Sequence, residues 1–220
     1  MSLIDEIRAG LAELADPVRA VSQQAYMKSS MPFLGVSVPV SRRVTVDLGT
    51  AHDPTLDQII DAATTLWDEA RFREERYAAQ ALLTLRPAVG AWEVIDLVEH
   101  MAVTGAWWDL VDEAAHRVAD LLDRHPESTR PRVLIWSTHD DMWLRRLAIE
   151  SQLQRRARTD TDLLTRVIEP NLADSRFFIR KAIGWALRDY AKADPDWVRD
   201  FVDTHDLSPL SRREALKHLS

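Results

Sequence analysis

The sequence has no cysteine among its 220 residues. This absence excludes a disulfide scaffold, an iron–sulfur cluster, a cysteine-based zinc site and a thiol nucleophile. Long apolar runs are also missing, since none approaches the roughly 20 residues that a helix needs to cross a bilayer. The N-terminus is acidic and amphipathic, which is not typical of a secretory signal. We therefore expect a cytoplasmic protein with no membrane partner.

Glycine is scarce, with only 6 residues, while alanine, leucine and arginine are abundant. This composition favours helices and disfavours a sheet rich in tight turns. Amphipathic segments of helical length follow one another between short Pro, Asp and Ser stretches. The predicted helices are 3–14, 54–67, 71–85, 107–122, 141–155, 161–168, 175–191, 195–202 and 211–219.

Two short segments, 35–40 and 44–48, alternate with a period of two and could form a pair of strands. Pro39 and the lack of other strand candidates argue against a sheet. We therefore predict a proline-initiated helix from about residue 39 and an all-α fold class.

A repeat runs along the chain. Alanines in successive amphipathic helices lie at 78, 114, 148 and 182, which are 36, 34 and 34 residues apart. Such a period corresponds to one helical hairpin, and a hairpin buries its apolar face only by stacking on its neighbours. No linker interrupts the chain. The pattern predicts a single domain over 1–220, built of HEAT-like or armadillo-like helical hairpins that stack into a curved solenoid with a concave groove.

Stacking places equivalent positions in a row, so the residues two before each alanine form a line. They are Arg76, Asp112, Arg146 and Arg180. Three cations and one carboxylate fit a groove that contacts phosphates, with one anion placed for chemistry. Alternatively, these positions are exposed to solvent and favour arginine, which explains the same row without a function.

Charge is distributed unevenly along the chain, although the net charge is -7. Residues 44–135 hold 8 cations and 17 anions, whereas residues 136–192 hold 11 cations and 8 anions. In the basic segment, one helical face is predicted to carry Lys181, Trp185, Arg188 and Lys192, which are spaced 4, 3 and 4 residues apart. A tryptophan among cations suits stacking beside phosphates, or it is an anchor with long basic side chains around it.

The motifs of several enzyme classes are missing. There is no glycine-rich phosphate loop, no nucleophile elbow and no paired histidine spacing for a metal. We therefore expect no cofactor and no metal.

Several segments together resemble the AlkD-like DNA alkylation repair family, which comprises HEAT-like repeat alkylpurine DNA glycosylases. The similarity spans nearly the whole chain in the right order. The matching segments are 26–28, 33–36 with Pro39 and 42–43, 108–112, 143–148, 178–188 and 212–217.

The resemblance implies excision of cationic N3- or N7-alkylated purines from double-stranded DNA. Because the repeat places no lysine near Asp112, we expect a monofunctional enzyme without lyase activity. It assigns Asp112 as the catalytic carboxylate and Trp108 and Trp185 as indoles that pack on the deoxyribose. Arg146 corresponds to a DNA-backbone contact and Tyr26 to a residue of the cleft. We expect a monomer associated with the nucleoid, and the predicted DNA-binding residues are Tyr26, Lys28, Arg43, Arg76, Arg146, Arg180, Lys181 and Arg188.

This assignment is chemically consistent. A cationic purine leaves as a neutral base, so the demanding step is the positive charge on the sugar, which becomes oxocarbenium-like. A carboxylate aimed at the sugar stabilises that charge more in the transition state than in the ground state. Two alternatives use the same scaffold: a non-catalytic binder of DNA structures, which the presence of Asp112 disfavours, and a protein-binding helical-repeat scaffold.

Overall fold

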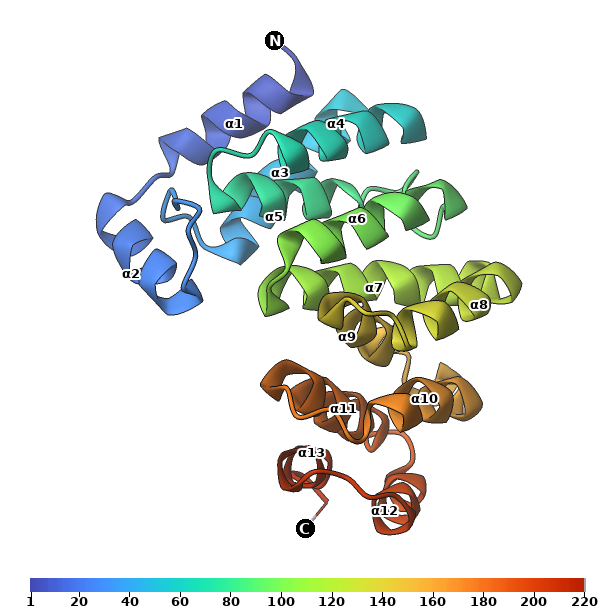
Figure 1. Ribbon diagram of the computed structural model, residues 1–220. Coiled ribbons are helices and arrows are strands. Elements are labelled where there is room, and N and C mark those ends of the chain that lie inside the picture. Colours follow the sequence, from blue (N-terminus) through green and yellow to red (C-terminus); the bar gives the residue numbers. More distant parts are fainter. Residues whose placement is uncertain (220) are drawn as a thin grey trace. The chain divides into compact units, whose positions relative to one another are not determined.

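The computed structural model describes residues 1–219, and these residues form helices and no strand (Figure 1). The all-α prediction is confirmed. Three short 3-10 helices occur at Trp92–Val94, Arg156–Arg158 and Glu169–Asn171. The α-helices are α1 (Leu3–Glu13), α2 (Pro17–Met27), α3 (Val38–His52), α4 (Leu56–Asp68), α5 (Arg73–Leu82), α6 (Ile95–Gly105), α7 (Trp108–Arg124), α8 (Pro126–Ser137), α9 (Met142–Glu150), α10 (Thr161–Ile168), α11 (Phe177–Tyr190), α12 (Pro195–Thr204) and α13 (Pro209–Ala215).

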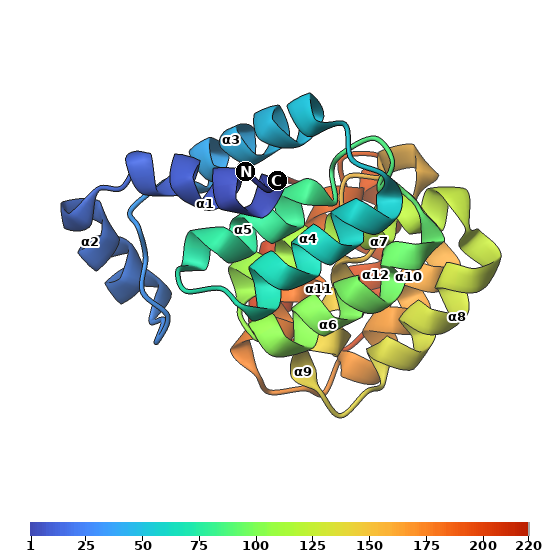
Figure 2. The same ribbon diagram turned by 90° about the horizontal axis from the view of Figure 1, so that it is seen from above.

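The chain forms two compact units, of which the first is Met1–Leu97 and the second begins at Val98. In the first unit, α5 packs against α3 and α4, and α1 packs against α3. Its core includes Ile7, Leu11, Leu66 and Trp67, all fully buried. Figure 2 shows α2 standing apart from the other helices of this unit.

The segment that follows α2 is fixed by one buried carboxylate. Glu74 in α5 is 0% exposed, and its oxygens accept hydrogen bonds from the backbone N–H groups of Leu34 (2.9 Å), Gly35 (2.9 Å) and Val36 (3.1 Å). Gly35 has φ +89°, and a Cβ there would lie 2.1 Å from the Asp16 carbonyl oxygen. This turn leads into α3, which begins at Val38, so the helix predicted from about residue 39 is confirmed.

The second unit is built of helical hairpins in two layers (Figure 1). One layer consists of α7, α9, α11 and α13, which pack in that order, and α8, α10 and α12 pack on the other side. The repeat predicted from the alanines is confirmed in both units: Ala78, Ala114, Ala148 and Ala182 lie in α5, α7, α9 and α11, and each is at most 2% exposed. The small side chain permits close approach between neighbouring helices.

Several helix boundaries differ from the prediction. The helix expected over 141–155 ends at Glu150, and a turn with positive φ at Gln154 follows it. The helix expected over 211–219 begins at Pro209 and ends at Ala215. The prediction did not include α2, α6 or α8, of which α8 contains an internal proline, Pro131. Whether residues 1–220 act as one domain stays a prediction.

Among residues 1–219, no helix is long and apolar enough to cross a membrane.

Candidate active site

Two neighbouring helices of the second unit, α7 and α9, bring their predicted site residues next to each other. In α9, the Asp141 side chain accepts hydrogen bonds from the N–H groups of Trp143 and Leu144, and this N-cap fixes where the helix begins. Asp112 lies four residues after the first residue of α7, and Arg146 lies four residues after the first residue of α9. Because α7 and α9 pack together, this common register brings the two side chains face to face.

Arg146 binds Asp112 through two hydrogen bonds. Nε donates to Oδ1 at 2.7 Å and Nη2 donates to Oδ2 at 2.9 Å, while Nη1 donates to the Phe178 carbonyl oxygen at 2.7 Å. The Arg146 side chain is 1% exposed, but that of Asp112 is 19% exposed. The guanidinium is therefore held inside the protein, and the carboxylate lies at the edge that a ligand can reach.

Two features of its environment act on the ionisation of Asp112 in opposite directions. Burial raises the pKa of this carboxyl, and the charge of Arg146 acts in the opposite direction. A net upward shift means that desolvation outweighs the ion pair. A carboxylate held in this way has lost much of its water, so it interacts strongly with any cation that approaches it.

Trp185 of α11 lies beside this pair and is surrounded by cations. The charged ends of Arg146, Lys181 and Arg188 lie 5.6, 5.5 and 5.7 Å from its ring centroid. Glu214 of α13 links the outer two, with Oε1 3.0 Å from Lys181 Nζ and Oε2 2.9 Å from Arg188 Nη1. The indole is thus fixed between charged groups and is only half-buried.

Close packing of α13 on α11 depends on a glycine. A Cβ at Gly184 would lie 2.4 Å from the Glu214 Cβ and 3.0 Å from the Ser211 carbonyl oxygen. Without a side chain at this position, Glu214 reaches the two basic residues of α11.

The two tryptophans at the start of α7 have different surroundings. Trp107 belongs to an aromatic cluster, with ring centroids 6.2 Å from Trp143 and 5.5 Å from Phe178. Trp108 is half-buried and lies one helical turn before Asp112 on the same face of α7. Of the three predicted catalytic residues, Trp108 and Asp112 thus lie on one helix. Trp185 lies on another helix, beside the Arg146 guanidinium that binds Asp112.

The other predicted DNA-binding residues occupy different environments. In the second unit, Arg180 is half-buried and its Nε donates to the Asp174 carbonyl oxygen at 3.1 Å. In the first unit, Tyr26 is 75% exposed, Lys28 and Arg43 are exposed, and the Arg76 guanidinium lies 4.8 Å from the Trp67 ring centroid. The contact of Arg146 with the DNA backbone stays a prediction, and in the structure this guanidinium binds protein groups.

Two acidic residues of the site, Glu150 and Glu214, were not predicted from the sequence. Glu150 follows Arg146 by four residues, the spacing of an intrahelical ion pair, and this signal was available in the sequence. Glu214 lies in a segment that contributed to the family resemblance but received no role. Its contact with Lys181 and Arg188 depends on how α13 packs.

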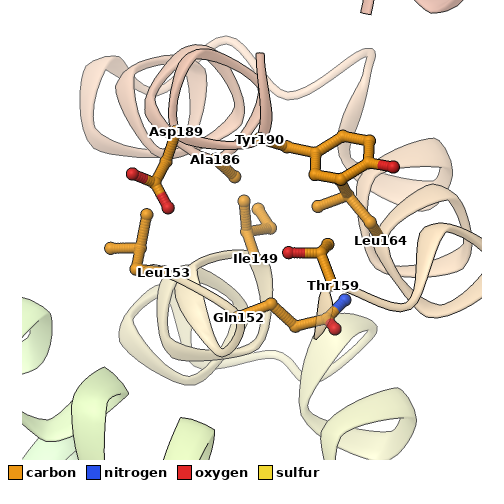
Figure 3. Close-up of a pocket in the computed structure, with 8 residues that line it drawn as sticks. All are labelled: Ile149, Gln152, Leu153, Thr159, Leu164, Ala186, Asp189 and Tyr190. Atoms are coloured by element: carbon orange, nitrogen blue, oxygen red, sulfur yellow. The ribbon is translucent and has the colours of Figure 1, made fainter. Parts of the chain in front are cut away.

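A separate hollow opens at the far ends of α9 and α11 (Figure 3). Its lining residues are Ile149, Gln152, Leu153, Thr159, Leu164, Ala186, Asp189 and Tyr190. Two of its polar groups are already bonded: Asp189 accepts from the Gln154 N–H at 2.6 Å, and Gln152 pairs with the Asp160 backbone. In the part of the chain that the structure describes, no group of three or more acidic or histidine side chains is placed to hold a metal ion. The Asp112 site is therefore the stronger candidate.

The fold and this site define a helical-repeat protein with a partly buried carboxylate bound by an arginine that also lies beside a tryptophan. A family model described as DNA alkylation repair enzyme matches residues 7–219. The chain therefore belongs to the DNA alkylation repair enzyme family.

Two solved structures resemble this protein. A predicted DNA alkylation repair enzyme from Enterococcus faecalis is 28% identical, with 94% of this chain and 97% of that chain covered and a TM-score of 0.82. The Pseudomonas fluorescens alkylpurine DNA glycosylase AlkC, bound to DNA containing an abasic site analog, is 19% identical with a TM-score of 0.51. This second match covers 99% of this chain but 61% of that chain, and it shows a shared fold. No curated protein matches the sequence significantly.

Proposed function

We propose that this protein is an AlkD-like, monofunctional DNA glycosylase that hydrolyses the N-glycosidic bond of cationic N3- or N7-alkylated purines in duplex DNA. The observation that carries this proposal is the Asp112 carboxylate, which is 19% exposed and held by two hydrogen bonds from a buried arginine. A fixed, poorly hydrated carboxylate is the group that a sugar cation requires.

The mechanism assigns Asp112 to the sugar. As the bond between base and sugar breaks, the positive charge moves from the alkylated purine to the deoxyribose. Asp112 stabilises this charge and orients the attacking water, and Arg146 keeps the carboxylate in place. The faces of Trp108 and Trp185 attract the same cation.

DNA binding is assigned to basic and aromatic residues around Asp112 and in the first unit. Lys181 and Arg188 are 25% and 22% exposed and remain near enough to solvent to meet a phosphate. Arginine donates bidentately to phosphate. The proposed set is Tyr26, Lys28, Arg43, Arg76, Arg146, Arg180, Lys181 and Arg188.

The test is base release from methylated duplex DNA. The wild type should release N7-methylguanine, and Asp112→Asn should abolish release but retain DNA binding, because the amide keeps the shape and loses the charge. Asp140→Asn is the matched control, since this exposed residue lies in the turn before α9. Equal release by Asp112→Asn and wild type would refute the mechanism.

The same assay separates the two alternatives. A DNA-structure binder would bind duplex DNA without base release at any time. A protein scaffold would show little DNA affinity even at low salt, whereas binding through phosphates weakens steeply as salt rises.

A further inference from the structure

A second carboxyl lies behind the Asp112–Arg146 pair. Glu150 is the last residue of α9, one turn after Arg146, and it is 0% exposed. Its Oε1 lies 2.8 Å from Arg146 Nη2. No N–H group of a described residue donates a well-directed hydrogen bond to either oxygen of Glu150, and its remaining partner is the Asp112 carboxylate, which accepts a hydrogen bond from the protonated Glu150. A fully buried carboxyl with so few partners is costly to ionise.

One cation faces two carboxyls in this cluster. Arg146 on α9 and Asp112 on α7 are the charged groups that act on Glu150, and Asp109 on α7 acts on Asp112. Asp189, the buried carboxyl of α11, is held elsewhere by the Gln154 N–H and Lys192. The helices α8 and α10 also pack on α9, and they bury apolar side chains. If Asp112 and Glu150 are both ionised, the cluster carries one net negative charge.

The energetics favour a neutral Glu150 in the resting protein. Burial raises the pKa of the Glu150 carboxyl well above its usual range, and the charge of Arg146 offsets this only in part. The Asp112 charge raises the pKa of Glu150 further. When Glu150 is neutral, the positive charge of Arg146 largely cancels the electrostatic field of Asp112 at the deoxyribose.

We propose that Glu150 is a positioning residue of the Asp112 site. Glu150 holds Arg146 in register with Asp112, and the ionised form of Glu150 makes the site more reactive. On titration the O–H bond of Glu150 breaks and water takes the proton. Arg146 then shares its charge between two carboxylates, so the field of Asp112 at the sugar is less cancelled. That field favours the oxocarbenium-like state over the ground state. This inference rests on the proposed glycosylase function.

The experiment compares pH profiles of single-turnover N7-methylguanine release from duplex DNA over about pH 5.5 to 8.5, which lies above the ordinary pKa of a glutamate carboxyl. The variants are Glu150→Gln, which keeps an oxygen for Arg146 but cannot ionise, and Glu150→Leu, which removes the polar group. Glu127→Gln is the matched control, because Glu127 is an exposed residue of α8 in the same unit.

The wild type and Glu127→Gln should become faster with rising pH, by about tenfold over the titration if Glu150 changes the barrier by the equivalent of one pKa unit. Glu150→Gln should stay flat at the low-pH rate of the wild type, with DNA affinity unchanged. If Glu150→Gln fails to fold, Glu150→Leu should also give a flat profile, at a lower rate than Glu150→Gln because Arg146 loses this partner.

Three outcomes would overturn the inference. The first is a flat profile of the wild type. The second is a wild-type slope that is retained in both Glu150 variants. The third is a Glu150→Gln profile that keeps the wild-type slope but lies below it by the same factor at every pH, which a purely structural role produces. A wild type that releases no base at any pH would overturn the proposed function and this inference together. An active wild type whose slope survives in the variants would overturn this inference alone.

Discussion

Arg146 and Asp112 lie 34 positions apart in the chain, one repeat length, and form a two-pronged ion pair with Nε and Nη2 bound to Oδ1 and Oδ2. The pair occupies equivalent places in neighbouring hairpins. Stacking of the repeats therefore creates the candidate site, since each hairpin supplies one of the two charges.

Replacing Arg146 with alanine should destabilise the protein by about 3–5 kcal/mol, because two carboxyls remain buried without their cation. Urea unfolding measures this loss. Adding Asp112→Asn to the alanine variant should recover part of the stability, since it removes the carboxylate that has lost its cation. Arg43→Ala, at an exposed position, is the control and should unfold like the wild type. If Arg146 acts only on a phosphate, Arg146→Ala would bind DNA weakly with unchanged stability.

The sequence predicted which helices carry this site, but it predicted less of how the side chains inside the site are directed. The alanine period located the hairpins, because buried small residues must recur wherever helices pack closely. It also placed Asp112 and Arg146 in one row, from which we predicted a phosphate contact for Arg146. Whether an arginine turns inward depends on how closely two helices approach. A helical period does not specify that distance.

The end of α9 illustrates the same limit. Its apolar pattern continues beyond Glu150, so the predicted helix was too long, and Glu150 received no role. In the structure, the helix ends where the buried carboxyl meets Arg146. The sequence spacing indicated an ion pair, but exposed pairs with this spacing are common and contribute little. Burial distinguishes this one.

Glu74→Gln should destabilise the protein, because its carboxylate accepts three backbone N–H groups in the turn at 34–36. An amide keeps one acceptor oxygen, so at least one buried donor loses its partner, at a cost of about 1–3 kcal/mol. Urea unfolding measures the change. Glu93→Gln, at an exposed position of the first unit, serves as the comparison. Stability equal to the wild type would show that the turn does not depend on this carboxylate.

Gly184→Ala should push α13 away from α11, because the new Cβ meets the Glu214 Cβ and a backbone oxygen of Ser211. Overpacking of this kind costs about 1–3 kcal/mol, which thermal unfolding would detect. Adding Glu214→Gly should bring α13 back toward α11 and recover more stability than adding Glu214→Ala, since alanine keeps the clashing Cβ and both changes remove the same carboxylate. Rescue by Glu214→Ala would show that the carboxylate, and not the Cβ, causes the strain.

The stability of the wild type should fall with rising pH more steeply than that of Glu150→Gln. Because burial raises the pKa of Glu150 in the folded state, the folded protein holds this proton more tightly than the unfolded chain does. The stabilisation is complete below the unfolded pKa, about 4.3 for glutamate, and is lost as pH rises through the folded pKa. One group contributes at most about 1.4 kcal/mol per pH unit within that window. The raised pKa of Asp112 acts in the same direction, and because the two carboxyls interact, the difference between the two proteins reports the contribution of Glu150 together with its effect on Asp112. Urea unfolding at several pH values measures that difference, and parallel curves would mean that Glu150 is ionised throughout.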